Sequence, residues 1–262
     1  MEHIQKVQID SVGTRYAVLD LLKWFAIITM VVDHISILFP DQSYLLRSIG
    51  RWAFPLFCLI LAFNLHTAIN SQKTTTLSNY FKNLFIFSLL SEIPYQMYIT
   101  GPFETLSVMP TLLIGFILVV LGESTKKSDT ILFFILALIT IFFSKYIMYG
   151  FYGVFLIATI YLSLKVSSAN KQKTLVILSG ILAALGNLSA WYIGGFYNYI
   201  ETYPMAFSFA VNSFLATVIG CIILLNISNI DLKLNIPRIG KWAYLFYPIH
   251  LVIIYVLSKI VF

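Results

Sequence analysis

Long runs of apolar residues, separated by short polar segments, make up nearly the whole chain after residue 17. The runs lie at residues 18–39, 48–69, 79–99, 105–122, 129–146, 149–165, 174–192, 205–226 and 241–261. Most of them approach the roughly 20 residues that an α-helix needs to cross a bilayer. They are continuous, whereas the strands of a membrane barrel alternate apolar and polar residues. The pattern therefore predicts an all-α, polytopic integral membrane helical bundle with about nine transmembrane helices.

The boundaries between the runs leave some freedom in this number. Only a tight turn, from Lys145 to Gly150, separates the fifth run from the sixth, so eight or ten spans are alternatives. Residues 1–17 are polar and mixed in charge, and they predict a cytoplasmic N-terminal segment. No small-residue cleavage site follows the first run, so we expect that run to be retained as a span. Residues 18–262 contain no internal repeat and predict a single transmembrane domain.

The basic residues between the runs predict the orientation of the chain. With the N-terminus inside, the cytoplasmic segments carry twelve Lys and Arg residues and the outer loops carry three. Positively charged loops stay on the cytoplasmic side of a membrane. The distribution therefore predicts an inside N-terminus, an outside C-terminus and an odd number of spans. Two of the three outer basic residues are Arg47 and Arg51.

Composition agrees with a membrane protein and excludes several other classes. The 262 residues are 59% hydrophobic and 11% charged, whereas a soluble domain carries about 25% charged residues. The net charge of +6 comes largely from the short loops, so it indicates topology and no binding of nucleic acid. Cys58 and Cys221 lie inside apolar runs without a C-x-x-C pair or a metal-ligand spacing, so we expect neither a disulfide nor a metal site.

Ionisable residues are concentrated at the ends of the first two runs. A charged side chain at membrane depth costs roughly 2.5–3.5 kcal/mol even on mild scales, so such groups usually serve a substrate, an ion or a proton. The alternative is that some of them, Lys23 and Arg47 in particular, extend to lipid headgroups. The residues concerned are Asp20, Lys23, Asp33, His34, Arg47 and Arg51.

The first run presents a polar stripe. Lys23 and His34 are eleven residues apart, which on an α-helix returns to nearly the same face about three turns later. Asp20 lies one turn before Lys23 on that stripe. Histidine is the side chain best suited to general base catalysis near neutral pH. Asp33 is adjacent to His34 and does not share its face, so we expect it to cap or orient. The alternative is that headgroups satisfy His34 at the helix end.

Two arginines mark the start of the second run. Arg47 and Arg51 are four residues apart and so share one helix face, where they predict an anion clamp for a carboxylate, a phosphate or a developing oxyanion. Gly50 between them permits close approach of another backbone, and Pro55 weakens the helix that follows.

Two further ionisable groups lie within apolar runs beside prolines. Glu92 precedes Pro94 in the third run, and His250 follows Pro248 in the ninth. We expect both to carry function, with a structural hydrogen bond between helices as the alternative. His66, at the cytoplasmic end of the second run, is predicted to be interfacial.

Five segments in order, LDLLKWFAIITMVVDHI, LRSIGRWAFPLF, LLSEIPY, YGFYGVFLI and LFYPIHL, resemble the TraX family. The family is named for the F-pilin acetylase of conjugative plasmids. The resemblance covers nearly the whole chain, and DH followed by R-x-x-x-R-x-A-F-P-L-F is its most specific part. More distantly, the spacing of eleven from Lys23 to His34 is similar to that of a basic residue and a histidine in the acyltransferase-3 membrane enzymes.

The resemblance implies transfer of an acetyl group from acetyl-coenzyme A at the bacterial inner membrane. The acceptor would be an amine or a hydroxyl of an envelope component, such as a pilin N-terminus, a surface glycan or a lipid. His34 would be the base, Asp33 its support, and Arg47 and Arg51 the clamp for a carbonyl or a phosphate. We assign Glu92 to the same catalytic group, and to binding of acetyl-coenzyme A we assign Asp20, Lys23 and His250.

Two other classes of function compete with the acyltransferase. A transporter could use His34, Glu92 and His250 as a proton relay, but the chain lacks the paired repeats of broken helices that secondary transporters show. A scaffold for pilus assembly would leave the ionisable groups within the apolar runs unexplained.

Overall fold

The computed structural model describes residues 16–99, 103–193, 203–230 and 235–261. Throughout these ranges the regular structure is helical and contains no strand, which confirms the predicted all-α class. The predicted N-terminal segment, residues 1–17, lies almost wholly outside the described residues.

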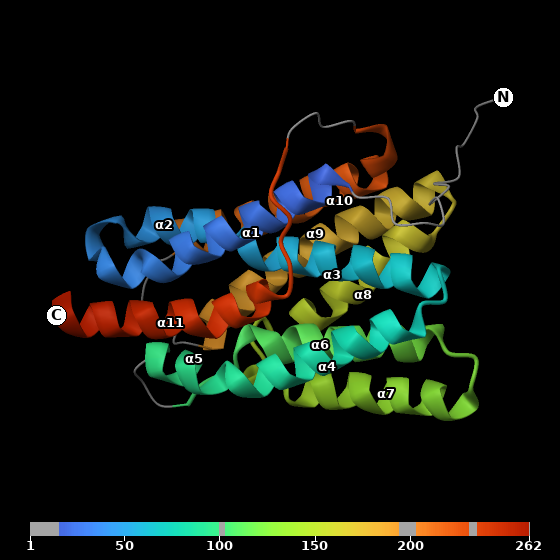
Figure 1. Cartoon of the computed structure of the whole chain (residues 1–262), viewed down its shortest axis with the longest axis horizontal. Coiled ribbons are helices and arrows are strands. Elements are labelled where there is room, and N and C mark those ends of the chain that lie inside the picture. Colours follow the sequence, from blue (N-terminus) through green and yellow to red (C-terminus); the bar gives the residue numbers. More distant parts are fainter. Residues whose placement is uncertain (1–15, 100–102, 194–202, 231–234, 262) are drawn as a thin grey trace.

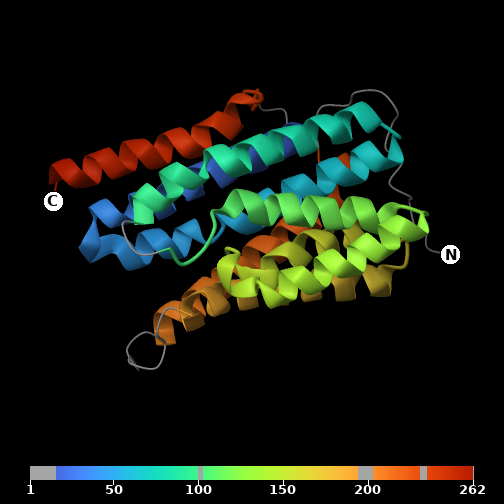
Figure 2. The same cartoon turned by 90° about the horizontal axis from the view of Figure 1, so that it is seen from below.

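The helices run close to one common direction and pack side by side into a bundle (Figures 1 and 2). Short 3-10 turns lie at Ser36–Leu38, Pro40–Gln42, Ser144–Tyr146 and Ile227–Asn229. The α-helices of the described residues are α1 Ala17–Ile35, α2 Ser43–Gly50, α3 Ala53–Asn70, α4 Thr74–Leu90, α5 Glu92–Ile99, α6 Val108–Glu123, α7 Lys127–Phe142, α8 Gly150–Lys165, α9 Ala169–Ile193, α10 Tyr203–Leu225 and α11 Trp242–Val261.

Each predicted apolar run contains helix, but the second and third runs each contain two helices. The second is divided between α2 and α3 at Arg51, and the third between α4 and α5 at Ser91. A proline follows each break: Pro55 stands four residues after Arg51, and Pro94 stands four residues after Leu90, the last residue of α4. Because proline has no N–H to bond the carbonyl four residues earlier, the helix ends there and a new one starts with proline in its first turn.

Four described helical ranges are long and apolar enough to cross a membrane. They are Ala17–Leu38, Pro40–Asn70, Met205–Leu225 and Trp242–Val261, while Val108–Glu123 and Gly150–Lys165 are apolar but shorter. The chain is therefore a membrane protein with several apolar helices. The number of nine spans and the inside N-terminus stay predictions.

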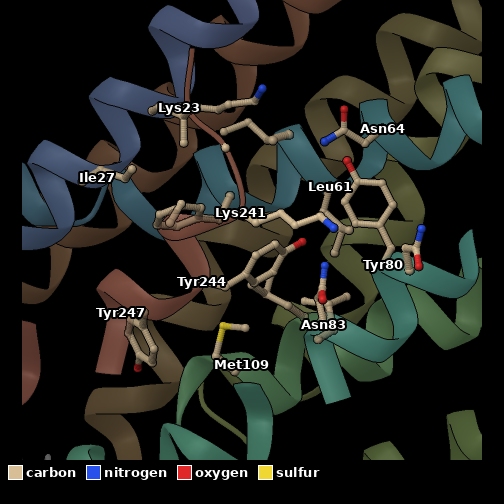
Figure 3. A pocket seen from close by; sticks show the side chains of 18 of the residues that line it. Lys23, Ile27, Leu61, Asn64, Tyr80, Asn83, Met109, Lys241, Tyr244 and Tyr247 are labelled. Carbon is tan, nitrogen blue, oxygen red and sulfur yellow. The ribbon is translucent and has the colours of Figure 1, made fainter. Parts of the chain in front are cut away.

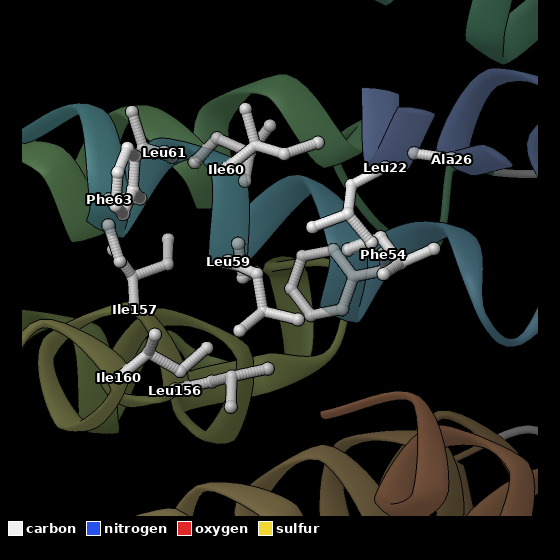
Figure 4. Close-up of a cluster of buried hydrophobic side chains, with 14 of the residues drawn as sticks. Leu22, Ala26, Phe54, Leu59, Ile60, Leu61, Phe63, Leu156, Ile157 and Ile160 are labelled. Atoms are coloured by element: carbon white, nitrogen blue, oxygen red, sulfur yellow. The ribbon is translucent and has the colours of Figure 1, made fainter. Parts of the chain in front are cut away.

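Helix α3 lies at the centre of the bundle and is buried on most of its surface. It packs against α1, α6, α8 and α10, and Leu59 meets Leu156 and Ile157 of α8 in the apolar core (Figure 4). By contrast, α7 at the edge of the bundle exposes a row of large apolar side chains, including Phe134, Leu138 and Phe142. In a membrane protein such a surface faces lipid.

Candidate functional site

The turn between α1 and α2 brings the residues of the DH and R-x-x-x-R motifs together. Asp33 and His34 lie in the last turn of α1, and Arg51 follows the last residue of α2. The two helices pack so closely that a Cβ atom on Gly50 would overlap the Cα and Cβ atoms of Asp33. Gly50 is therefore the residue that permits this approach.

Arg51 is held on several sides at once. Its Nη2 forms an ion pair with Asp33 Oδ1. Its Nε donates to the Arg47 carbonyl at 3.2 Å, and its Nη1 lies 3.4 Å from Oδ1 of the buried Asn187 on α9. The guanidinium also covers the ring of Phe209 on α10 at 5.0 Å. The planar, forked guanidinium suits these contacts, and it fixes the carboxylate of Asp33 in place.

His34 contacts a second histidine from the far end of the chain. Its Nδ1 lies 2.7 Å from Nε2 of His250 on α11, and the two rings stack with centroids 4.9 Å apart. Its Nε2 lies 4.0 Å from Oδ2 of Asp33. On another side, Tyr98 of α5 donates its hydroxyl to the His34 carbonyl at 3.1 Å. Arg51, Asp33, His34 and His250 thus form a continuous row, which we call the charge row.

Arg47 takes a different position from Arg51. Its Nε donates to Ser36 Oγ at 3.2 Å, in the turn that follows α1. The Arg51 side of the predicted anion clamp is already engaged by a protein carboxylate, that of Asp33. Binding of a substrate anion by Arg47 and Arg51 stays a prediction.

Glu92 lies at the start of α5 and is bonded within that region. Its Oε1 accepts from Gln96 Nε2 at 2.7 Å, and its Oε2 accepts from the Ser107 backbone N–H at 3.0 Å. Ser107 precedes the first residue of α6, so Glu92 ties α5 to the start of that helix. These contacts do not join Glu92 to the charge row, and its catalytic role stays a prediction.

A cavity of about 530 Å³ lies between α1, α3, α4, α6, α11 and residues 238–241. Three cations line it: Lys23 of α1, together with Arg238 and Lys241 before α11. Lys23 is paired with Asp20 at 3.0 Å. Amides and phenols gather on the same walls, as Figure 3 shows; they are Asn64, Asn79, Tyr80, Asn83 and Tyr244.

The other end of this cavity approaches the charge row. In Figure 3, Tyr247 and Met109 lie opposite Lys23 and Asn64. Tyr247 lines the cavity, and its ring centroid lies 6.4 Å from that of His34 and 5.6 Å from that of His250. Met30, one helical turn before His34, also lines it. The cavity therefore extends from a cationic end to Met30 and Tyr247, which separate it from the two histidines.

The structure groups the predicted site residues in a way that differs in part from the sequence-based expectation. Asp20 and Lys23 lie together beside the cavity, as the stripe on the first run predicts. His250, which we assigned with them to the donor, instead contacts His34. Its role in binding acetyl-coenzyme A stays a prediction, but its contacts place it in the charge row.

Several site residues were not found from the sequence. Two of them could have been found: Asn187 is an amide within an apolar run, and Tyr247 lies three residues before His250 on the same helix face. Tyr98 and the three asparagines of the cavity gave no such signal, because their positions depend on how the helices pack. Within the described part of the chain, no three His, Cys, Asp or Glu residues lie together as metal ligands would.

Comparison with known proteins gives one match over most of the chain. Residues 18–258 match the family model described as TraX protein. A stretch of 47 residues is 40% identical to the uncharacterized protein RP591 of Rickettsia prowazekii (strain Madrid E), covering 18% of this chain and 19% of that protein. The chain thus spans about a fifth of that curated relative in the match. No solved structure matches the chain, and the similarity to acyltransferase-3 enzymes stays a prediction.

Proposed function

This chain belongs to the TraX family, and from that membership we propose that it is a membrane-bound acyltransferase. It transfers an acetyl group from acetyl-coenzyme A to an amine or hydroxyl of an exported or envelope acceptor. The observation that carries the proposal is the cavity with cations at one end and, at the other, Tyr247, whose ring lies beside the His34–His250 pair. The cavity offers an anionic donor a path toward a candidate base.

The cationic end of the cavity suits the phosphates of coenzyme A. Lys23, Arg238 and Lys241 supply positive charge, which favours phosphate binding. The amides and phenols beside them supply hydrogen bonds and ring faces for the adenine base. Lys23 and His34 are eleven residues apart on α1, which is about 16 Å at the rise of an α-helix. The extended pantetheine arm of coenzyme A is suited to span this apolar stretch past Met30 and Tyr247.

The transfer step uses the charge row. The acceptor amine or hydroxyl attacks the thioester carbonyl carbon while His34 takes its proton, and the carbon–sulfur bond breaks. The coenzyme A thiolate then receives the proton that His34 holds. Asp33, fixed by Arg51, faces the protonated His34 at 4.0 Å and stabilises its charge. Arg47 and the N–H groups that Arg51 does not use supply positive charge near the carbonyl oxygen.

The acceptor is reached from the outer side of the bacterial inner membrane in this proposal. The namesake of the family suggests the N-terminal amine of a pilin, whereas a hydroxyl of a surface glycan or lipid would need the same catalytic parts. Coenzyme A is cytoplasmic, and the orientation that the loop charges predict would put the cationic end of the cavity on that side.

One observation also fits a proton-coupled transporter. The direct bond between His34 and His250 could pass a proton between α1 and α11. Glu92, the third member of the relay expected for a transporter, bonds instead to Gln96 and Ser107. This arrangement favours the acyltransferase.

The proposal is tested with purified protein in lipid nanodiscs. The protein is mixed with radiolabelled acetyl-coenzyme A and an envelope fraction from cells that lack it. We expect release of free coenzyme A and a labelled envelope component that can be isolated and identified. A transporter would bind no acetyl-coenzyme A and would transfer no label, and that result would overturn the proposal.

A further inference from the structure

The hydrogen bonds of the charge row determine which nitrogen of His34 can accept a proton. We infer that His250 is a positioning residue that holds His34 in the tautomer with its proton on Nδ1 and a lone pair on Nε2. The tautomer follows from the contacts alone, whereas its role in catalysis rests on the proposed acyl transfer.

The ring of His250 has its proton on Nδ1. Its Nδ1 lies 2.9 Å from the carbonyl oxygen of Phe246, one turn earlier on α11. A carbonyl oxygen can only accept a hydrogen bond, so Nδ1 of His250 carries a proton. A neutral imidazole has a single N–H, and Nε2 of His250 is therefore an acceptor.

The ring of His34 also has its proton on Nδ1. Its Nδ1 lies 2.7 Å from Nε2 of His250, so this nitrogen must donate. The remaining nitrogen, Nε2, is then the one with a lone pair, and it lies 4.0 Å from Asp33 Oδ2. The opposite tautomer would place two lone pairs against each other across the 2.7 Å contact. The partner of one ring nitrogen thus sets the state of the other.

Both histidine rings are held in position by their neighbours. The ring of Phe246 stacks on His250 with centroids 5.2 Å apart and planes 7° apart, and Tyr247 packs on it at 5.6 Å. His250 is 5% exposed. Arg51 occupies Oδ1 of Asp33, which leaves Oδ2 toward His34. A ring flip at His250 would break the bonds to Phe246 and to His34 together.

This geometry identifies the atom that acts in the reaction. The proton of the acceptor N–H or O–H passes to His34 Nε2 as the new bond to the acyl carbon forms and the carbon–sulfur bond breaks. The same proton then passes to the coenzyme A thiolate. His250 accepts the Nδ1–H of His34 throughout and neither gains nor loses a proton, so it acts through His34 and does not touch substrate.

The test is nitrogen NMR of the full chain in lipid nanodiscs, with isotope-labelled histidine and at alkaline pH where unpaired imidazoles are neutral. The His34→Gln spectrum identifies the His34 signals. We expect a protonated Nδ1 and an unprotonated Nε2 in wild type. His250→Gln, whose amide oxygen still accepts, should keep this pattern, whereas His250→Leu should move the proton to Nε2. His66→Leu, a buried histidine bonded to Asn70, is the matched control and should leave His34 unchanged.

The acetyl-transfer rate of the His250 variants is a second, independent measurement. We expect His250→Leu to lower the acetyl-transfer kcat by about 10- to 100-fold, part of the 10²–10⁴ that a general base typically contributes. His250→Gln should retain most of it. A protonated Nε2 in wild-type His34, or an unchanged tautomer in His250→Leu, would overturn the inference. If the tautomers are as expected but wild type transfers no acetyl group, the inference stands and the proposed function fails.

Discussion

At the scale of single residues, the chemistry of His34 depends on partners that come from other helices. Asp33 alone is adjacent in the sequence, and it is held toward His34 by Arg51 after α2. His250 arrives from α11 and Tyr98 from α5. The apolar surroundings strengthen each of these contacts relative to water. Substitution of any one partner should therefore change the contacts that surround His34.

Replacement of His34 is the first prediction at this scale. His34→Gln keeps a hydrogen-bonding side chain but removes the base, so kcat should fall by about 10²–10⁴-fold. Binding of acetyl-coenzyme A should be unchanged, because Lys23, Arg238 and Lys241 are not altered. Steady-state rates and isothermal titration with coenzyme A measure the two quantities. His66→Gln is the matched control, and equal rates for the two variants would contradict the role of His34.

Arg51 provides the second prediction. Arg51→Lys keeps the charge, but an ammonium group cannot reach Asp33, Asn187 and the Arg47 carbonyl in a fork. Hydrogen bonds to charged groups contribute about 1.5–3 kcal/mol each, so loss of even one should lower activity roughly tenfold or more. Turnover and Michaelis constants of membranes containing equal amounts of protein provide the measurement. Near-normal values would show that the fork geometry is unimportant.

The sequence predicted His34, Asp33 and Arg51 as site residues because apolar surroundings make each of them costly. It could not show that Arg51 binds Asp33, since the two lie on different helices and in different motifs. Periodicity gives the face of a helix on which a residue lies, but it does not give the helix that this face meets. For the same reason the sequence could not show that His250, which was assigned to the donor, contacts His34.

At the scale of elements, two helix breaks shape the site. The break before α3 leaves the Arg51 carbonyl outside the helical ladder, where it accepts from Ser213 Oγ at 3.4 Å, and the break before α5 places Glu92 where it bonds Ser107. A hydropathy pattern shows α2 with α3, and α4 with α5, as one apolar run each. The breaks between them arise from the missing N–H of a proline, which hydropathy does not detect. Pro55 and Pro94 were the available signals, and each acts four residues before its own position.

The close approach of α1 and α2 gives a prediction with a matched control. Gly50→Ala would push a Cβ atom into the backbone and side chain of Asp33, whereas Gly122→Ala would meet only the Phe133 ring at 3.5 Å. Overpacking typically costs about 1–3 kcal/mol. Gly50→Ala should therefore lower both thermal stability in detergent and acetyl transfer, and Gly122→Ala should change neither. Similar behaviour of the two variants would contradict this packing of α1 on α2.

The cations of the cavity are predicted to contribute to binding of acetyl-coenzyme A. Arg238 and Lys241 are exposed, so each should contribute about 0.2–1 kcal/mol to binding of an anion. Changing both to Gln should weaken acetyl-coenzyme A binding by several fold while kcat changes little. The effect should shrink at high salt, because salt screens exposed charges. Lys259→Gln, at the other end of α11, is the control, and an equal loss there would show that the effect is one of net charge.

At the scale of the whole molecule, the sequence predicted the all-α class and most helix positions. The sixth run, 149–165, agrees closely with α8 at Gly150–Lys165. Helix α9 begins earlier than its run, at Ala169, because Lys and Gln are good helix formers despite their polarity. The cavity could not be predicted, since its walls come from five helices, and the first and the last of these, α1 and α11, lie near opposite ends of the chain.

The orientation of the chain in the membrane decides whether coenzyme A can reach the cationic end of the cavity. Reporter fusions in the α6–α7 loop and in the α8–α9 loop should both be cytoplasmic, because these loops are rich in lysine. The cationic end of the cavity would then lie on the side where coenzyme A is found. An extracytoplasmic reporter at either loop would reverse the proposed path.

We propose that the protein transfers an acetyl group from a cytoplasmic donor to an outer acceptor, with His34 as the base that takes the proton of the acceptor. This transfer is measured in inverted membrane vesicles, whose cytoplasmic face is outward, after addition of radiolabelled acetyl-coenzyme A. Vesicles with wild-type protein should accumulate label on envelope components inside, where added protease cannot reach. Vesicles with His34→Gln should accumulate none. Equal labelling by the two proteins, or no labelling by wild type, would contradict the account.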